Sequence, residues 1–256
     1  RGTLNVLEAV RKAGGDAPII FSSTNKVYGG LEDVPLIETG ERYWPTEPAI
    51  RDFGIPESRR LDFSTPYGCS KGVADQYVLD YAKSFGLRCA VMRMSCIYGP
   101  RQLGTEDQGW VAYFLIRALG GEPIMLFGDG KQVRDILHVD DAVAAYRTVH
   151  RSLMREDVRG SGVAYNLGGG PRNAVSLVQL LSEIERLTGR PVRVDAADWR
   201  QGDQRYFVAD TSRLERQFGW QQRVSWQSGV LHLARWLSQE RFHGRGLAPE
   251  RRRVTA

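Results

Sequence analysis

The sequence predicts an α/β fold built on a parallel sheet, and two features of its first hundred residues indicate it. Helix-like and strand-like patterns alternate along residues 1–99, and the run at 18–24 ends in three hydroxyl side chains. From about residue 100 short strands are mixed with helices, which indicates a second, smaller lobe. In a parallel α/β sheet, ligands bind at the carboxyl ends of the strands. We therefore expect a functional site near residue 24.

The first elements follow from hydrophobic spacing. Leu4, Leu7 and Val10 share one helix face within residues 1–15, and two glycines end that run. The apolar run at 18–24 suits a buried parallel strand. Residues 30–66 are rich in Pro and Glu and show little periodicity. A loop of that length predicts a functional role in covering or lining a site.

The next two elements are a helix and a strand. We expect the helix from about Ser70 to Phe85 and the strand at residues 87–99. The apolar face of the helix is predicted to consist of Val73, Tyr77, Val78 and Tyr81. Together with the first elements, they complete the helix and strand alternation of a parallel sheet.

The second half contains helices and short strands in mixed order. Helices are predicted at 109–121, 140–153 and 228–239, and a strand–turn–strand around Gly-Asp-Gly at 123–139. The helix after Ser176 has a clear start: Ser176 as N-cap, Gln179 completing a capping box, and Val175 packing against Leu180. No repeat with a period of 20–50 residues occurs.

Composition excludes several classes of protein. The chain has 256 residues, 42% of them hydrophobic and 25% charged, as in an ordinary globular protein. The net charge is +5, but residues 240–256 alone hold five Arg and two Glu. The rest of the chain therefore has too little positive charge to predict a nucleic-acid partner. The tail itself reads as a disordered end, with a binding arm as the alternative.

Cysteine use and hydropathy define the compartment. Cys69, Cys89 and Cys96 are odd in number and lack CxxC spacing, which predicts reduced thiols and neither a disulfide nor a metal site. The sequence has no apolar run of 18 residues. It therefore predicts no membrane partner and a cytoplasmic location.

Tyr67 and Lys71 form a candidate acid–base pair. At positions i and i+4 of a helix start they share a face. A nearby ammonium favours the phenolate and lowers the pKa of a tyrosine, which could then accept a proton from an alcohol. A half-buried tyrosine beside an exposed lysine is the alternative for an isolated YxxxK. Other motifs decide between these two interpretations.

Several motifs occur in a fixed order along nearly the whole chain. They are GTLNVLEAV, FSSTNKVYG, YGCSKG, YGPRQ, FGDGKQVRDILHVDD, YNLGGG and FVADTSRLERQFGW. In this set the sequence resembles the extended short-chain dehydrogenase/reductase superfamily, the NAD-dependent nucleotide-sugar epimerases and dehydratases. The resemblance implies a Rossmann-like parallel sheet, with its N-terminal strands missing here, and a smaller mixed α/β substrate-binding lobe. It also implies NAD as cofactor.

The resemblance implies roles for named residues. Thr24 would hydrogen-bond the reacting hydroxyl, Tyr67 would be the acid/base, and Lys71 would also hold the nicotinamide ribose. The other residues expected beside the cofactor are Ser22, Ser23, Ser95 and Cys96. Arg134 and Arg205 would hold the pyrophosphate of a nucleotide sugar, as guanidinium groups do well. His138 is expected to make a structural hydrogen bond only.

Further substrate contacts are proposed on loop positions. They are Asn25, Arg101, Gln108 and Gln132, for which hydrogen bonds within local turns are an equal alternative. No metal site is expected.

The reaction follows from what stands after Thr24. The 4,6-dehydratases of this superfamily carry an acidic pair at the positions of Asn25 and Lys26, so the resemblance favours epimerisation over water elimination. Its finer match is to members that invert C2 of a CDP-3,6-dideoxyhexose, CDP-paratose to CDP-tyvelose. Epimerisation or dehydration at C4 of another nucleotide sugar remains an alternative. Inversion of a carbinol carbon requires hydride removal and return, so NAD should stay bound.

The start of the chain raises a further alternative. A Gly-rich dinucleotide fingerprint is absent from the sequence, and NLGGGPRN at 166–173 reads as a turn. The resemblance implies that about 80–90 residues of a typical cofactor domain precede residue 1. We therefore expect residues 1–100 to be the later part of an NAD-binding domain, 101–239 a nucleotide-sugar lobe interleaved with the sheet, and 240–256 a tail. A non-catalytic nucleotide-sugar-binding protein is the alternative function.

An oligomer is also expected. The helices beginning near Gly2 and Ser70 resemble those that pair across a dimer in this superfamily, which implies a homodimer or higher homo-oligomer.

Overall fold

The computed structural model describes residues 1–155, 162–200 and 202–240. Its first sheet consists of β1 (Ile19–Thr24), β4 (Cys89–Met94) and β8 (Val163–Leu167) in the order β1-β4-β8. Both pairs are parallel, with Ile19 opposite Cys89 and Val91 opposite Ala164. The predicted α/β class and the parallel sheet are confirmed.

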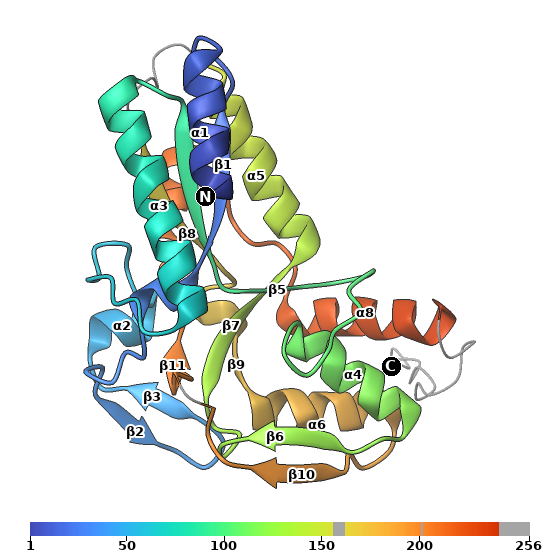
Figure 1. Cartoon of the computed structure of the whole chain (residues 1–256). Helices are drawn as coiled ribbons and strands as arrows, with labels where there is room; N and C mark the ends of the chain where they lie inside the picture. The colour runs from blue at the N-terminus through green and yellow to red at the C-terminus, as the bar shows by residue number, and fades with distance from the viewer. Residues whose placement is uncertain (156–161, 201, 241–256) are drawn as a thin grey trace.

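Helices cover both faces of this sheet (Figure 1). One face packs against α1 (Gly2–Lys12) and α3 (Pro66–Phe85), and the other against α5 (Val139–Leu153) and α7 (Ser212–Phe218). Along β4 the buried side chains alternate, with Cys89 and Val91 on the first side and Ala90 and Met92 on the second. This period of two is what a strand buried between two helix layers requires.

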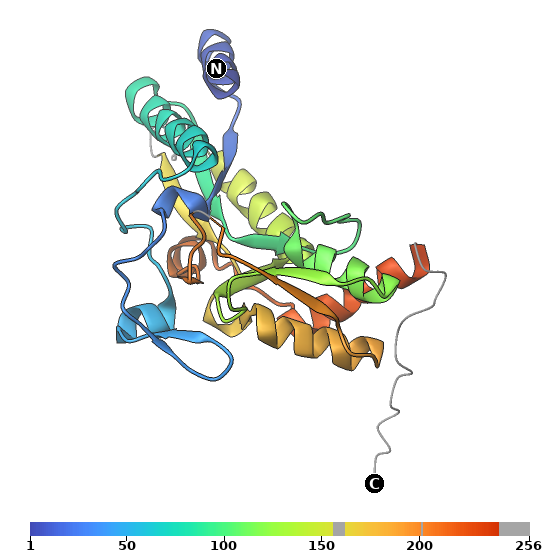
Figure 2. The same ribbon diagram turned by 60° about the horizontal axis from the view of Figure 1, so that its bottom comes forward.

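The second lobe is built around β7 (Val133–His138). Strand β7 pairs in parallel with β5 (Cys96–Tyr98) and β11 (Tyr206–Phe207), and antiparallel with β9 (Ala174–Ser176); β6 (Ile124–Phe127) pairs separately with β10 (Val194–Ala197). The predicted strand–turn–strand is therefore present, but its two strands belong to different sheets. Figure 2 shows these strands beside α4 (Trp110–Gly120), α6 (Leu177–Thr188) and α8 (Trp226–Glu240).

The segment at 30–66 is more ordered than its sequence suggests. It contains the hairpin β2 (Leu36–Glu38) and β3 (Tyr43–Pro45), followed by α2 (Pro48–Phe53). Its polar contacts reach the turn before β7, where Tyr43 donates to Asp129 and Lys131 pairs with Glu38. Elements of three to six residues are too short to show a hydrophobic period.

Two helix starts test the local rules. The capping box of α6 is confirmed, since Ser176 Oγ accepts from Gln179 N and Gln179 Oε1 accepts from Ser176 N, both at 3.1 Å. Helix α3 starts at Pro66, earlier than predicted, because Thr65 caps it and accepts a hydrogen bond from the Gly68 N–H.

The predicted apolar face of α3 is half wrong. Val78 and Tyr81 are buried against the sheet, but Val73 and Tyr77 are 51% and 44% exposed. Positions i and i+5 lie far apart around a helix, so Val73 and Val78 do not share one face. Helix α1 lies beside the same helix and contacts it (Figure 1).

Two predicted structural features are confirmed. His138 is the N-cap of α5, where its Nδ1 accepts from the Asp140 N–H at 3.3 Å. Gly168 and Gly169 lie in the turn after β8 and approach β7 closely, since a Cβ on Gly168 would lie 2.0 Å from Asp135 Oδ2. The run at 166–173 is therefore a strand end and a turn.

Other sequence predictions concern surfaces and ends. Cys69, Cys89 and Cys96 are free thiols. Within the described ranges, no helix has the length and apolar character needed to span a membrane. The tail predicted at 240–256 lies outside the described residues except for Glu240, which ends α8.

Candidate active site

The three parallel strands of the first sheet end at one edge. Thr24, Met94 and Leu167 are their last residues. After β4 the chain turns at Ser95, whose N–H donates to Leu167 O at 2.9 Å, and continues into β5. This edge therefore joins the first sheet to the second lobe.

Thr24 begins the turn that follows β1. Its Oγ1 accepts from the Lys26 N–H at 3.2 Å and donates to Asn25 Oδ1 at 3.3 Å. Asn25 in turn donates from Nδ2 to Gln204 Oε1 at 3.1 Å. Thr24 is 7% exposed, so these bonds fix its hydroxyl at the strand end.

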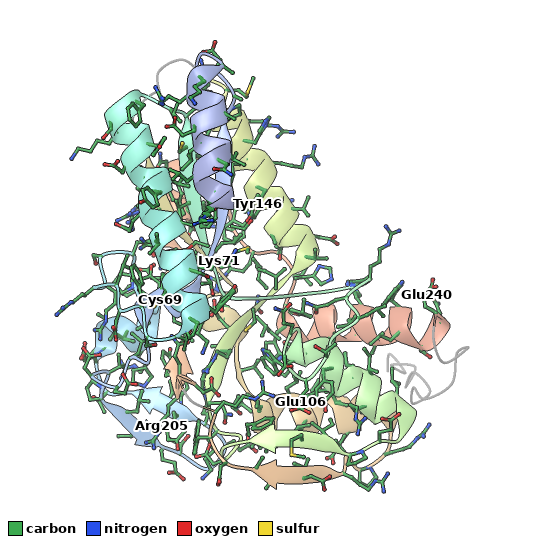
Figure 3. All side chains as sticks on the ribbon, in the orientation of Figure 1. Cys69, Lys71, Glu106, Tyr146, Arg205 and Glu240 are labelled. Carbon is green, nitrogen blue, oxygen red and sulfur yellow. The ribbon has the colours of Figure 1, made fainter. Side chains whose placement is uncertain are left out.

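Tyr67 and Lys71 lie in the first turns of α3. Tyr67 is 50% exposed, whereas Lys71 is partly buried. Lys71 Nζ donates to Ser22 O at 2.9 Å and lies 5.2 Å from the centre of the Phe21 ring. Figure 3 shows Lys71 between α3 and β1. The start of α3 therefore carries a half-exposed tyrosine and a lysine whose ammonium is anchored to β1.

Ser22 and Ser23 use their hydroxyls inside the protein. Ser22 Oγ lies 2.7 Å from the Tyr146 hydroxyl, and Ser23 Oγ donates to Asp75 Oδ2 at 2.8 Å. Asp75 is fully buried and pairs with Arg93 Nε at 3.0 Å. The two serines thus tie β1 to α5 and α3, and the second rests on a buried ion pair.

Ser95 and Cys96 are held by the second lobe. Ser95 Oγ donates to Asp135 on β7, and burial raises the pKa of that carboxyl group to about 6. Cys96 Sγ accepts from Trp110 Nε1 at 3.2 Å, and burial raises the pKa of its thiol. This shift disfavours the thiolate form of Cys96, which is the nucleophilic form of a cysteine.

A cavity of about 360 Å³ opens beside these residues. Its polar wall includes Asn25, Lys26, Gln132, Arg134 and Asp203. Its apolar wall comes from β5, α4, β6 and the start of α6, and includes Cys96, Trp110, Tyr113, Phe114, Met125, Phe127 and Leu177. Of the residues predicted from the sequence, the substrate contacts Asn25, Gln132 and Arg134 and the cofactor contact Cys96 line this cavity.

Three charges meet on the polar wall. Arg134 is 7% exposed, and its Nη2 donates to Asp203 Oδ1 at 2.6 Å. Lys26 Nζ lies 3.6 Å from the same oxygen and donates to Gly202 O at 3.1 Å. Burial and the neighbouring Arg134 lower the pKa of Lys26. Two cations thus share one carboxylate here, whereas elsewhere in the lining Arg200 pairs with both Glu106 and Asp107.

Another part of the cavity lining is aromatic. The guanidinium of Arg200 lies 3.9 Å from the centre of the Phe127 ring and pairs with Glu106 at 3.1 Å. Gln132 donates from Nε2 to Phe127 O at 2.7 Å, while its buried Oε1 has no partner among the described residues. The aromatic lining offers a surface on which a planar group could stack.

Three predicted substrate contacts do not line this cavity. Arg205 is exposed, and its guanidinium lies 5.7 Å from the Tyr43 ring and 5.6 Å from the Trp199 ring, towards the β2–β3 hairpin (Figure 3). Arg101 and Gln108 are exposed on the segment between β5 and α4. Arg101 has a φ of 73°, and the Gln108 carbonyl accepts from Thr105 N at 2.8 Å, as a local turn requires.

Sequence reasoning missed Lys26, Arg200 and Asp203 as cavity residues. In the sequence, Lys26 drew attention only because the 4,6-dehydratases have an acidic residue at its position. Arg200 and Asp203 lie in the run WRQGDQR, from which only the last arginine was taken. Spacing in sequence could not tell which arginine of that run faces the cavity.

Residues 1–168 match the model of the NAD dependent epimerase/dehydratase family. The chain is 43% identical over 242 residues to CDP-paratose 2-epimerase of Salmonella typhi. The aligned region covers 93% of this chain and 70% of that protein. A solved UDP-glucose 4-epimerase of Thermus thermophilus in complex with NAD has a TM-score of 0.72 and 28% identity, covering 93% and 69% of the two chains. A dTDP-glucose 4,6-dehydratase of Bacillus anthracis, in complex with NAD, has a TM-score of 0.73 and 26% identity, covering 93% and 67%.

Proposed function

The chain belongs to the NAD dependent epimerase/dehydratase family, and from that premise we propose that it inverts C2 of a CDP-3,6-dideoxyhexose, converting CDP-paratose to CDP-tyvelose. The observation that carries this proposal is the 43% identity to the Salmonella CDP-paratose 2-epimerase across 93% of the chain. Asn25 and Lys26 support it, because they leave no acidic pair for dehydration.

The proposed chemistry uses the edge of the first sheet. Thr24 Oγ1 would hold the C2 hydroxyl, and Tyr67 Oη would take the proton of that hydroxyl as the carbon is oxidised to a ketone. After the ketone turns over, Tyr67 would return the proton as the opposite face is reduced. Lys71 would keep Tyr67 able to accept a proton.

The residues at this edge fit the nicotinamide half of NAD. Lys71 Nζ is fixed 2.9 Å from Ser22 O, and Tyr67, four residues earlier on the same helix, is half exposed, so both side chains are candidates to bind ribose hydroxyls. Ser95 and Cys96 flank the same edge. When bound, NAD supplies the acceptor and donor of hydride that inversion of a carbinol carbon requires.

The cavity would hold the nucleotide part of the substrate. Arg134 offers a guanidinium for the diphosphate, and the aromatic part of the lining offers a stacking surface for the base. Gln132, whose Nε2 donates to Phe127 O at 2.7 Å, would support this part of the lining. Three other predicted substrate contacts lie outside the cavity, so in this proposal they would contact the substrate only at the cavity mouth: Arg205, Arg101 and Gln108.

A cytoplasmic location and a homodimer complete the proposal. Val6 on α1 and Val73, Tyr77 and Phe85 on α3 are each at least 44% exposed, and these two helices lie side by side (Figure 1). An apolar surface of this kind marks a protein interface. Light scattering of the purified chain would test it, and a monomer would contradict the dimer.

The decisive experiment follows CDP-paratose by NMR in deuterated buffer. The proposal expects CDP-tyvelose without deuterium at C2, because hydride is removed and returned without exchange with solvent. Denatured protein should also release stoichiometric NAD(H). A chain that binds CDP but releases no NAD and shows no inversion with added NAD would support the non-catalytic alternative.

A further inference from the structure

We propose that Lys26 is a further diphosphate-binding residue, which contacts the phosphate joined to the sugar of the substrate. This inference rests on the proposed function and gives it a new residue. It follows from three observations: the partners of the Lys26 ammonium, its place between Thr24 and Arg134, and the distance between the reacting carbon and the phosphate in a C2 epimerase.

The ammonium of Lys26 is incompletely paired. Arg134 holds Asp203 Oδ1 at 2.6 Å, whereas Lys26 Nζ is 3.6 Å from that oxygen, longer than a charge-assisted hydrogen bond. Its bond within 3.5 Å among the described residues goes to Gly202 O at 3.1 Å, which is a neutral acceptor. An ammonium has three donors, so Lys26 can still bind an anion.

The surroundings of Lys26 favour an anion. Its side chain is 30% exposed and faces the cavity, and a guanidinium stands on the same wall. Lys26 and Arg134 share the carboxylate of Asp203, which leaves one positive charge at this point of the lining, while Glu106 and Asp107 are paired with Arg200. Because the site is partly removed from water, an anionic ligand that enters it interacts more strongly than at an open surface.

The position of Lys26 suits inversion at C2. Its backbone N–H binds Thr24 Oγ1 at 3.2 Å, so the side chain starts at the proposed reaction edge and reaches the wall that holds Arg134. In a nucleotide sugar the diphosphate is attached to C1, next to C2. The reacting carbon of a C2 epimerase is thus three bonds from phosphorus, whereas C4 lies across the ring. A cation two residues after Thr24 is placed for the first geometry.

The test compares ligands with and without phosphate. We expect Lys26→Met to weaken binding of CDP by about tenfold to a hundredfold in calorimetric titration, as loss of a charged hydrogen bond does. Binding of cytidine, followed by ligand-observed NMR, should stay within about twofold, which also shows that the variant is folded. Lys26→Arg keeps the charge and should retain most of the CDP affinity.

Lys83→Met is the matched control, since Lys83 is exposed in the last turn of α3, away from the cavity. It should bind CDP as the unchanged chain does. CDP affinity that survives Lys26→Met, or an equal loss for cytidine and CDP, would overturn the inference, and so would an unchanged chain that binds no CDP. A chain that binds CDP but does not invert CDP-paratose would contradict the proposed function while the Lys26 comparison still gives its own result.

Discussion

The edge of the first sheet and the cavity of the second lobe hold their polar groups in different ways. At the edge, Tyr67 is 50% exposed and comes from the start of a helix. In the cavity, Arg134 is 7% exposed and is held in an ion pair with Asp203. In the proposed function these two regions have different roles. The edge supplies groups that exchange protons, and the cavity supplies fixed charges that bind an anion. Substitutions at the edge should therefore change rates, and those in the cavity should change affinities.

The largest effect is expected for Tyr67→Phe. Loss of the hydroxyl removes the proposed acid/base, so the inversion rate should fall by about 10²–10⁴-fold. CDP affinity should stay within about twofold, because Tyr67 lies outside the cavity. Turnover by NMR and calorimetry of CDP check both parts. A variant with a near-normal rate would remove the distinction between edge and cavity.

The buried support of the edge gives the next effect. Arg93→Met should lower the free energy of unfolding by about 3–5 kcal/mol, because Asp75 would stay buried without its cation. Arg186→Met is the control, since its ion pair with Glu183 on α6 is at the surface and should contribute less than about 1 kcal/mol. Urea unfolding measures both. Equal losses of unfolding free energy in the two variants would show that the buried pair of Arg93 and Asp75 contributes no more to stability than the surface pair.

Asp135 connects the two regions and should give a pH dependence. Its carboxylate accepts hydrogen bonds from the Ser95 hydroxyl and the Gly170 N–H, and burial raises its pKa from 3.8 in the unfolded chain to about 6 in the folded one. A raised folded pKa means that its contribution to stability is complete below pH 3.8 and is lost as pH rises through about 6. The size of this loss is on the order of 2–3 kcal/mol.

Asp135→Asn removes this titration. The free energy of unfolding of the variant, relative to that of the unchanged chain, should therefore rise between roughly pH 4 and pH 6. In this range the carboxyl of Asp135 is ionised in the unfolded chain but still protonated in the folded one. Thermal or urea unfolding across that range measures it. A difference that stays constant with pH would contradict the raised pKa.

The smallest effect separates two arginines. Arg134→Gln should weaken CDP binding by about tenfold to a hundredfold, because it lines the cavity. Arg205→Gln should weaken it by less than about threefold, since its side chain is exposed over Tyr43 and Trp199. Calorimetric titration with CDP compares them. A larger effect at Arg205 would restore the sequence prediction and place the diphosphate outside the cavity.

Most of the fold could be predicted from the sequence where elements are long or carry local signals. The alternation of buried strands and amphipathic helices predicted the parallel sheet, and Ser176 and Gln179 predicted the start of α6. The prediction was weaker where several partners compete for one element. The strands at β6 and β7 were found, but their partners, β10 and β11, lie about 70 residues later in the chain.

By itself, the sequence determined the longer elements, the family motifs and the spacing of Tyr67 and Lys71, because these depend on residues a few positions apart. Only the tertiary structure decided which charges face the cavity. Lys26, Arg134 and Asp203 come from three distant segments, and they meet because β1, β7 and the chain before β11 converge at one edge. Arg205 follows Asp203 by two residues, yet its side chain points elsewhere. Residues two apart on a regular strand would share a side, but the chain bends at Arg205 just before β11, so sequence spacing alone could not tell where each side chain points.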